Sequence, residues 1–260
     1  ELSALLDRPV KRPTMNLKVG NFQTTDRVKV KLQAADRCPR YAGRSVKGVK
    51  VGASPAWLVQ RLEAVGLRSI NNVVDVTNYV MFEYGQSLHA FDAKEIKGSD
   101  IIIRLSKKDE KFTSLDGTEV TLTGEELVIA DMERVVALAG IVGGQNSGVN
   151  EGTTELFIES AFFGAQGVRR TSRRLGFDTD SGYRFSRGVN PEQTVQALER
   201  ACDLMVQVAG GEVGKDFYDE YPQPIVKDPI LVDVNYIAQR VGYAVNESDF
   251  NKVMQRLGFK

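Results

Sequence analysis

The spacing of apolar residues predicts a helix in the first quarter of the chain. Ser54 and Pro55 are a typical N-cap and first-turn pair, and Gly66 is a typical helix stop. Between them, apolar residues recur at helical intervals over residues 58–65. The chain is therefore expected to be helical up to the residue before Gly66.

A second apolar pattern follows closely. It begins at Asn71 or Asn72 and ends before Gly85, with Thr77 near its middle. One helical face carries the valines Val73, Val76 and Val80. The β-branched residues would also suit a strand, but the helical period of the apolar positions favours a helix.

From Ile101 onward, short apolar runs separated by turn residues predict strands. These runs cover residues 101–105, 112–115, 120–122, 127–130 and 135–139. Asp116 and Gly117 lie between two of them and suit the positive φ angles of a tight hairpin turn. Antiparallel pairing is therefore expected.

The last third of the sequence is again helical in pattern. Asn190 and Pro191, with Gln193 three residues after the cap, open a long helix that Gly210 closes. Two shorter helices are expected beyond Pro222, at about residues 235–241 and 247–257.

These elements predict an α+β fold with mixed, largely antiparallel sheets, packed helices and the start of a small following domain. Residues 1–37 are expected to be a linker and the tail of a preceding domain, and residues 38–222 to form the main domain. Residues 223–260 then form the truncated start of a small helical domain, so the chain is expected to be part of a longer protein.

Composition narrows the class of protein. The 34 basic and 34 acidic residues cancel, which does not suit a general DNA or RNA binder, although a local basic face remains possible. Cys38 and Cys202 are the only cysteines and fit no disulfide scaffold or zinc pattern. The longest apolar stretch, residues 135–142, is too short to span a membrane. We therefore expect a cytoplasmic protein with no metal site, no DNA partner and no membrane partner.

The only histidine, His89, lies in a segment rich in polar groups. Asp75, Thr77, Asn78 and Asp92 are close to it in sequence. Together they supply a hydroxyl, an amide, two carboxylates and an imidazole that can hold a polar ligand. Alternatively, Thr77 bonds a backbone carbonyl one turn back and His89 is a structural loop residue.

Two further segments suggest a pocket. Gly140, Gly143 and Gly144 follow a predicted strand and allow the backbone to approach a ligand, although a bulge or tight turn would use glycines equally well. Glu159 interrupts an apolar strand, where alternation places it on the same face as Phe157 and Ala161. Such a carboxylate either faces water or is held for a reason.

A basic segment follows Glu159. Arg169 and Arg173 form one helical stripe and Arg170 and Arg174 another, which suits contacts with phosphates. A network of salt bridges would use the same residues.

Several motifs in this order resemble a known family. They are RSINNVVDVTNYVMFEYGQSLHAFD, LDG, LAGIVGGQNS, RRTSRRLGF and YRFSRGVNPE. The region from about Cys38 to Gly214 resembles the tRNA-editing module of the bacterial phenylalanyl-tRNA synthetase beta subunit. Residues 225–260 resemble the start of the next domain of that subunit, and the parts that resemble its catalytic core are missing.

The resemblance implies hydrolysis of the ester that joins a wrongly attached tyrosine to the tRNA for phenylalanine. It assigns catalysis to Thr77, Asn78 and His89. It also implies a substrate pocket formed by five residues, Gly140, Gly143, Glu159, Thr179 and Ser181. Ser87 and Ser181 depart from the family, in which proline and alanine are usual at these positions.

The resemblance also implies partners. They are the tRNA for phenylalanine and an alpha subunit that would complete the synthetase. The basic segment itself makes Arg169, Arg170 and Arg173 the expected contacts with that tRNA. ATP and Mg would serve the whole synthetase, with no cofactor in this fragment. The alternatives are a non-catalytic tRNA-docking or subunit-scaffolding module and, more remotely, a serine hydrolase that uses Ser160, His89 and Asp92.

Overall fold

Residues 1–259 are described by the computed structural model, and the chain divides into two units. The larger comprises residues 15–224, and the smaller combines residues 1–14 with residues from 225 onward. The fold is α+β with mixed, largely antiparallel sheets, as the sequence predicts.

The larger unit is organised around the strand β10 (Glu155–Phe162), which pairs antiparallel with β2 and β3. The sheet order is β11-β2-β10-β3, and β12 also pairs with β2. The bounds of these strands are Arg40–Lys47 for β2, Leu88–Asp92 for β3, Glu212–Val213 for β11 and Tyr218–Glu220 for β12. β10 is thus a central strand.

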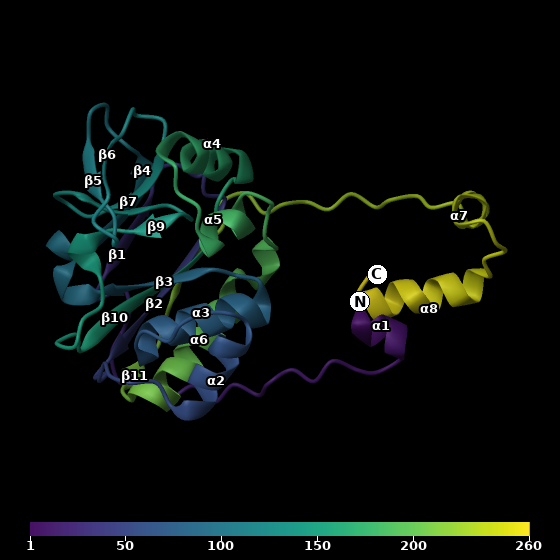
Figure 1. Ribbon diagram of the computed structural model, residues 1–260, viewed down its shortest axis with the longest axis horizontal. Helices are drawn as coiled ribbons and strands as arrows, with labels where there is room; N and C mark the ends of the chain where they lie inside the picture. Colours follow the sequence, from purple (N-terminus) through teal and green to yellow (C-terminus); the bar gives the residue numbers. More distant parts are fainter. Residues whose placement is uncertain (260) are drawn as a thin grey trace. The chain divides into compact units, whose positions relative to one another are not determined.

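Both faces of this sheet are covered, because β10 alternates between two apolar clusters. Leu156 and Ile158 pack with side chains of three helices, whereas Phe157 and Ala161 face the other cluster. The helices are α2 (Ala56–Ala64), α3 (Asn72–Tyr84) and α6 (Thr194–Ala209), which lie together on one side of the sheet in Figure 1. The predicted alternation around Glu159 is therefore confirmed.

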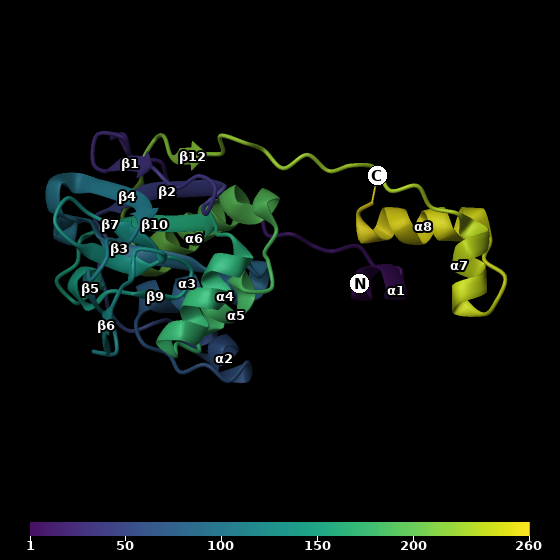
Figure 2. The same cartoon turned by 90° about the horizontal axis from the view of Figure 1, so that it is seen from above.

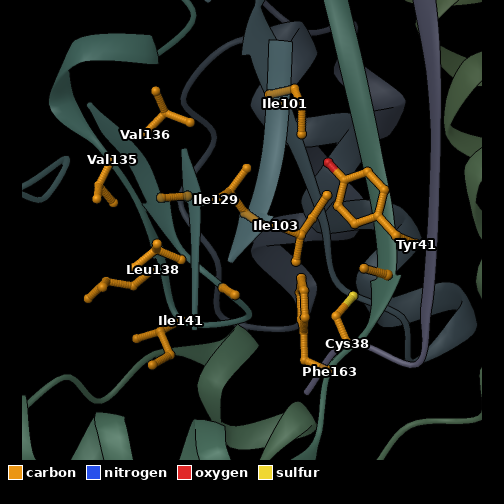
Figure 3. Packing of buried hydrophobic residues seen from close by; sticks show 14 of the residues in the cluster. Cys38, Tyr41, Ile101, Ile103, Ile129, Val135, Val136, Leu138, Ile141 and Phe163 are labelled. Atoms are coloured by element: carbon orange, nitrogen blue, oxygen red, sulfur yellow. The ribbon is translucent and has the colours of Figure 1, made fainter. Parts of the chain in front are cut away.

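A second sheet covers the opposite face, in the order β1-β4-β7-β8-β9. Its strands are β1 (Lys29–Leu32), β4 (Asp100–Leu105), β7 (Leu127–Ala130), β8 (Val135–Leu138) and β9 (Val142–Gly143). Only β1 and β4 pair parallel. Figure 3 shows part of the cluster between the sheets, where Tyr41 and Phe163 point toward Ile103.

The predicted hairpin consists of β5 (Lys111–Thr113) and β6 (Glu119–Thr121), which pair antiparallel. The turn differs from the expected two-residue type. Ser114 N donates to Thr118 O at 3.0 Å, so three residues form the loop, and only Gly117 in it has a positive φ, of 84°. A single αL residue after a type I turn is the usual three-residue solution.

The predicted helices are all present, but two begin later than their expected caps: the N-cap of α2 is Pro55 rather than Ser54, and that of α6 is Gln193 rather than Asn190. The side chain of Asn71 caps α3 by accepting from Val73 N and Val74 N, and Gly85 ends the helix at a φ of 70°. Before α6, Pro191–Gln193 form a 3₁₀ turn whose cap is Asn190. The local capping signals therefore placed both ends of α3, whereas Asn190 caps only the turn that leads into α6.

Two helices that follow β10 border the candidate site. They are α4 (Ala165–Leu175) and α5 (Asp180–Phe185), and Figures 1 and 2 both show them side by side. Shorter 3₁₀ turns cover Ala93–Glu95, Lys97–Ser99 and Gln145–Ser147.

Residues 15–37 belong to the larger unit, so this unit begins before the boundary expected at Cys38. The reason is backbone pairing that the local pattern does not reveal. β1 pairs with β4, Gly20 N donates to Val213 O at 2.8 Å, and Thr24 Oγ1 donates to Asp216 O at 2.8 Å.

The smaller unit contains α1 (Leu2–Leu6), α7 (Val234–Val241) and α8 (Glu247–Leu257). Asp7, which ends α1, forms an ion pair of 2.6 Å with Arg256 of α8. The helices expected at about 235–241 and 247–257 are confirmed. Among the helices of residues 1–259, none is long and apolar enough to cross a membrane.

Candidate functional site

A small cavity in the larger unit brings together residues from distant parts of the sequence. Its volume is about 90 Å³, well below the roughly 300–1,000 Å³ of sites for larger ligands. The polar lining residues are Ser87, His89, Glu159 and Ser181, and the apolar ones include Phe163 and Phe185. The cavity thus has the size for one side chain and offers a few polar groups to orient it.

Glu159 lies on β10, directly opposite His89 on β3 and Gly43 on β2. Only 6% of Glu159 is exposed, and its Oε2 accepts a hydrogen bond of 2.8 Å from the buried hydroxyl of Tyr41. The alternative of a solvent-facing carboxylate is therefore wrong. The carboxyl group is held in place, and it lines the cavity.

Burial raises the pKa of Glu159 to about 7, and the hydrogen bond from Tyr41 only partly opposes this rise. The cause is the low polarity of the cavity wall, which disfavours the charged form. Near neutral pH, the carboxyl group therefore exists in comparable amounts of its charged and neutral forms. In either form it can bond a ligand hydroxyl.

His89 lies edge-on to Phe91, with ring centroids 4.4 Å apart. Burial lowers the pKa of His89 to about 4, so the imidazole is neutral at pH 7. Its Nε2 atom is buried and has no hydrogen-bond partner among the described residues. The imidazole therefore carries an unused, buried polar atom in a residue that lines the cavity.

The expected close approach of the glycine segment is observed. A Cβ atom at Gly143 would collide with the ring of His89, and one at Gly140 would come within 2.8 Å of Phe163. Gly140 also has a φ of 70°, which favours glycine. Both residues line the cavity, where a side chain would fill the space.

Not every amide of this segment is available to a ligand. Ile141 N donates to Leu138 O at 3.0 Å, and Gly144 N donates to Val136 O at 2.8 Å. These two groups are engaged within the protein, so they cannot stabilise a developing oxyanion without breaking existing hydrogen bonds.

Thr179 and Ser181 connect α5 to the glycine segment. Thr179 Oγ1 caps α5 by accepting from Gly182 N and donates to Ile141 O at 2.9 Å. Ser181 Oγ donates to Gly140 O at 3.1 Å and lines the cavity. Thr179 lines a neighbouring groove instead, so it supports the pocket wall from behind.

Thr77 and Asn78 lie on α3 and are not among the residues that line the cavity. Thr77 Oγ1 donates to Val74 O at 2.7 Å. This confirms the alternative in which the hydroxyl group bonds a backbone carbonyl of its own helix. Asn78 is half-buried on the same helix. The structure therefore does not bring these two residues together with His89 and Glu159 at the cavity wall.

The residues of a serine-type triad are not assembled. Ser160 lies on the face of β10 opposite to Glu159, and its Oγ donates to Thr194 O at 2.8 Å. Asp92 accepts from Thr153 Oγ1 at 2.6 Å rather than from His89. Ser160 could act as a nucleophile beside His89 only if its side chain moved to the other face of β10.

The arginines of α4 lie outside the cavity, on the exposed surface. Arg169 and Arg173 border a groove of about 600 Å³ between α4 and α5, together with Arg187. Arg170 forms an ion pair of 3.8 Å with Glu125, and Arg174 pairs with the buried Glu126. Arg173 has no ion pair within residues 1–259 and is the least engaged of the four.

Tyr41 was not predicted as a site residue, yet it is fully buried and donates a hydrogen bond to Glu159. Tyr41 and Glu159 are diagonal neighbours on paired strands, because Tyr41 lies opposite Ala161. Only the register between β2 and β10 reveals this contact. The sequence around Tyr41 gives no clear signal, because Arg40 and Arg44 interrupt the apolar residues of this strand.

No group of three His, Cys, Asp or Glu side chains that could hold a metal ion occurs within residues 1–259. Cys38 and Cys202 are free and buried.

Comparisons with known proteins all point to the same kind of protein. The B3/4 domain family matches residues 37–210. The phenylalanine–tRNA ligase beta subunit of Bdellovibrio bacteriovorus is 51% identical over 258 residues, which is 99% of this chain and 32% of that protein. The corresponding subunit of Geobacter metallireducens is 44% identical over 260 residues, again 32% of its length.

The chain thus spans about a third of the length of the curated relatives that it matches. A solved N-terminal fragment of the phenylalanyl-tRNA synthetase beta subunit from Pyrococcus horikoshii is also similar, at 16% identity and a TM-score of 0.49. That similarity covers 94% of this chain and 67% of the fragment. The family match over residues 37–210 and the two bacterial relatives lead to one conclusion: the chain belongs to the B3/4 domain family and is similar over its length to phenylalanine–tRNA ligase beta subunits.

Proposed function

We propose that the cavity hydrolyses the ester that joins tyrosine to the tRNA for phenylalanine. The observation that carries this proposal is Glu159, a buried carboxyl group at the wall of a cavity for one side chain. Tyr41 holds one carboxyl oxygen of Glu159, which supports a role for the other oxygen in binding a ligand hydroxyl.

Glu159 provides a physical basis for discrimination. Tyrosine differs from phenylalanine by one hydroxyl group, which the carboxyl group would bond. Phenylalanine would leave a buried polar group unpaired, and sites of this kind reject the analogue that lacks the hydroxyl by roughly 10⁴-fold in favourable cases. The correctly charged tRNA would thereby escape hydrolysis.

The hydrolysis itself requires one water molecule. The water oxygen bonds to the ester carbonyl carbon, and the bond from that carbon to the ribose oxygen breaks. One water proton ends on the ribose oxygen, and the second is released from the new carboxylic acid. His89 is neutral and has a free Nε2 atom, which suits it to orient the water or the terminal ribose rather than to act as a strong base.

Thr77 and Asn78 would act on the same reaction only if the bound tRNA reached α3, since neither lines the cavity. Arg169 and Arg173 would contact phosphates of the tRNA from the groove beside α5, whereas Arg170 would first have to leave Glu125. Synthesis of phenylalanyl-tRNA, with ATP, Mg and an alpha subunit, would take place in parts of the ligase beyond this chain.

The test measures deacylation of tyrosyl-tRNA and phenylalanyl-tRNA, both made with the tRNA for phenylalanine. Glu159→Ala should abolish the preference for tyrosine, and His89→Ala should slow hydrolysis of both. Wild-type protein that hydrolyses neither substrate, both as this chain and in the assembled ligase, would contradict the proposal.

A non-catalytic tRNA-docking module is the second candidate, and the exposed arginines of α4 favour it. Such a module would bind the tRNA without hydrolysing the ester. Binding that depends on Arg173 while deacylation is absent and Glu159→Ala has no effect would support this candidate.

A further inference from the structure

An exposed aromatic residue and an arginine form a stacked pair in the groove between α4 and α5. Tyr183 is 54% exposed, and Cζ of Arg187 lies 3.4 Å from the centroid of its ring. That separation is about the van der Waals contact distance, so the planar guanidinium can only lie face to face with the ring. Both residues line the groove.

The guanidinium of Arg187 is held in place without being neutralised. Its Nη1 atom donates to the backbone oxygen of Tyr183 at 3.1 Å. Arg187 forms no ion pair in the part of the chain that the structure describes. It therefore presents a flat, positively charged surface to the groove. RNA bases stack on aromatic rings and on guanidinium planes of this kind.

The rest of the groove suits phosphates. Three arginines line it, Arg169, Arg173 and Arg187, against the single carboxylate of Asp178, which leaves a local charge of +2. A positively charged groove that also carries a stacking surface is the usual arrangement in proteins that bind single-stranded nucleic acid. In a duplex the bases are already stacked on one another, so they are not free to stack on the protein.

The groove and the cavity lie on different faces of the same helix. Thr179 and Tyr183, four residues apart, line the groove, whereas Ser181 and Phe185 of α5 line the cavity. Residues two apart on a helix point to nearly opposite sides, and a helix with its side chains is only about 10–12 Å across. A chain bound in the groove therefore passes close to the cavity.

We propose that the groove binds an unpaired segment of RNA, with one base stacked on the Arg187–Tyr183 pair and its phosphates near Arg173. The segment is the single-stranded 3′ end of the tRNA, whose last ribose carries the amino acid. This identification of the segment rests on the proposed function, whereas the binding of unpaired RNA rests on the groove alone.

Tyr236 and Arg240 provide a matched control pair. Tyr236 is 51% exposed, and Cζ of Arg240 lies 5.3 Å from the centroid of its ring. Both residues belong to α7 in the smaller unit and do not line the groove. Tyr236→Leu therefore removes an exposed ring beside an arginine without touching the proposed site.

The experiment measures RNA binding by the wild type and by Tyr183→Leu, Tyr183→Phe, Arg187→Lys and Tyr236→Leu. The probe is a fluorescent single-stranded RNA of about twelve nucleotides, within the usual site size of single-strand binders. A duplex RNA and a glutamate peptide of the same length are the comparison ligands. Fluorescence anisotropy at several salt concentrations gives the affinities, and thermal unfolding verifies that each variant is folded.

Loss of one base stack should weaken binding of the single strand about 5- to 100-fold in Tyr183→Leu. Tyr183→Phe keeps the ring and should retain the affinity. Arg187→Lys keeps the charge but not the flat surface, so it should weaken binding without changing the salt dependence. Tyr236→Leu should bind like the wild type. The single strand should bind more tightly than the duplex or the glutamate peptide.

Wild-type affinity for the single strand in both Tyr183→Leu and Arg187→Lys would overturn the inference. Equal or tighter binding of the duplex or of the glutamate peptide would also overturn it, as would the absence of RNA binding by this chain and by the assembled ligase. Deacylation of tyrosyl-tRNA by the wild type tests the proposed function separately. If deacylation is absent while binding depends on Tyr183, the groove remains a site for unpaired RNA and only its assignment to the 3′ end fails.

Discussion

Two opposing effects act on the pKa of the Glu159 carboxyl group. Burial makes its charge unfavourable, whereas the hydrogen bond from Tyr41 stabilises that charge. With the resulting pKa of about 7, the fraction of the charged form, which is the stronger acceptor for a ligand hydroxyl, changes across the physiological pH range. The neighbouring titratable groups are Cys38, Tyr41 and His89.

Glu159→Gln should change how stability depends on pH. The native pKa of Glu159 is about 7 against an ordinary value of 4.5, so the native state binds the proton more tightly. The free energy of unfolding of the wild type therefore loses a contribution as pH rises from 4.5 through 7. Glutamine does not titrate, so its free energy of unfolding has no such loss. Between pH 4.5 and 8, the free energy of unfolding of the variant should therefore rise relative to that of the wild type by up to roughly 3 kcal/mol. Urea unfolding at several pH values measures this difference.

The wild-type curve alone would hide this effect because His89 acts in the opposite direction. Its native pKa of about 4 lies below the ordinary 6.5, so its contribution to stability is lost as pH falls from 6.5 through 4. The difference between Glu159→Gln and wild type removes the His89 contribution. A difference that does not vary with pH would show that Glu159 titrates normally.

Tyr41→Phe should destabilise the protein more at pH 8 than at pH 5. The variant leaves Oε2 of Glu159 without its donor, which raises the pKa of Glu159 further and costs about 1–3 kcal/mol when the carboxylate is charged. Chemical unfolding at both pH values measures the loss. Tyr218→Phe is the control, because the Tyr218 hydroxyl donates to the neutral carbonyl of Val28 at 3.0 Å. Equal losses at both pH values in Tyr41→Phe would contradict the argument.

At the scale of elements, the cavity lies where the glycines of β9 and its flanking residues let the backbone pack directly against the His89 side chain of β3. Gly143 of β9 is where this approach is closest, since a Cβ atom there would meet the His89 ring. The φ angle of Gly143 is not positive, so the backbone itself would accept alanine. The constraint is purely steric.

Gly143→Ala should therefore displace the His89 ring and cost about 1–3 kcal/mol of stability, as overpacking does elsewhere. Urea unfolding measures the cost, and the imidazole NMR signal reports the displacement. Gly167→Ala is the control: Gly167 lies in α4 with open space around its Cα, and alanine should stabilise the helix by about 0.5–1 kcal/mol. An unshifted His89 signal in Gly143→Ala would contradict the packing argument.

At the scale of the whole molecule, the net charge of zero gives no general attraction to nucleic acid. Any contact with tRNA must depend on local clusters such as the groove between α4 and α5. Arg173 is the arginine of α4 that lines this groove without an ion pair or a hydrogen bond within residues 1–259, whereas Arg169 donates to Ser186 O.

Arg173→Ala should weaken tRNA binding and lower the slope of log affinity against log salt concentration by about 0.7–1, the effect of one lost phosphate contact. Binding measured at several salt concentrations tests this. Arg170→Ala, whose guanidinium pairs with Glu125 outside the groove, should change the slope less. If both variants change it equally, the groove has no special role.

The sequence by itself determined the local elements of this protein. Asn71 and Gly85 delimit α3 because capping depends on neighbouring residues only, and Gly210 ends α6 in the same way, whereas Asn190 caps the 3₁₀ turn before α6. Strand alternation also placed Glu159 on the correct face. The resemblance of the motifs identified the family, and the comparisons confirm it.

Only the tertiary structure decided which groups meet. The hydrogen bond from Tyr41 to Glu159 depends on the register of two strands more than 100 residues apart, and no local pattern specifies that register. The same holds for the parallel pairing of β1 with β4 and for the absence of Thr77 from the cavity wall. Local propensity sets where elements begin and end, but the shared burial of their faces sets which side chains form the site.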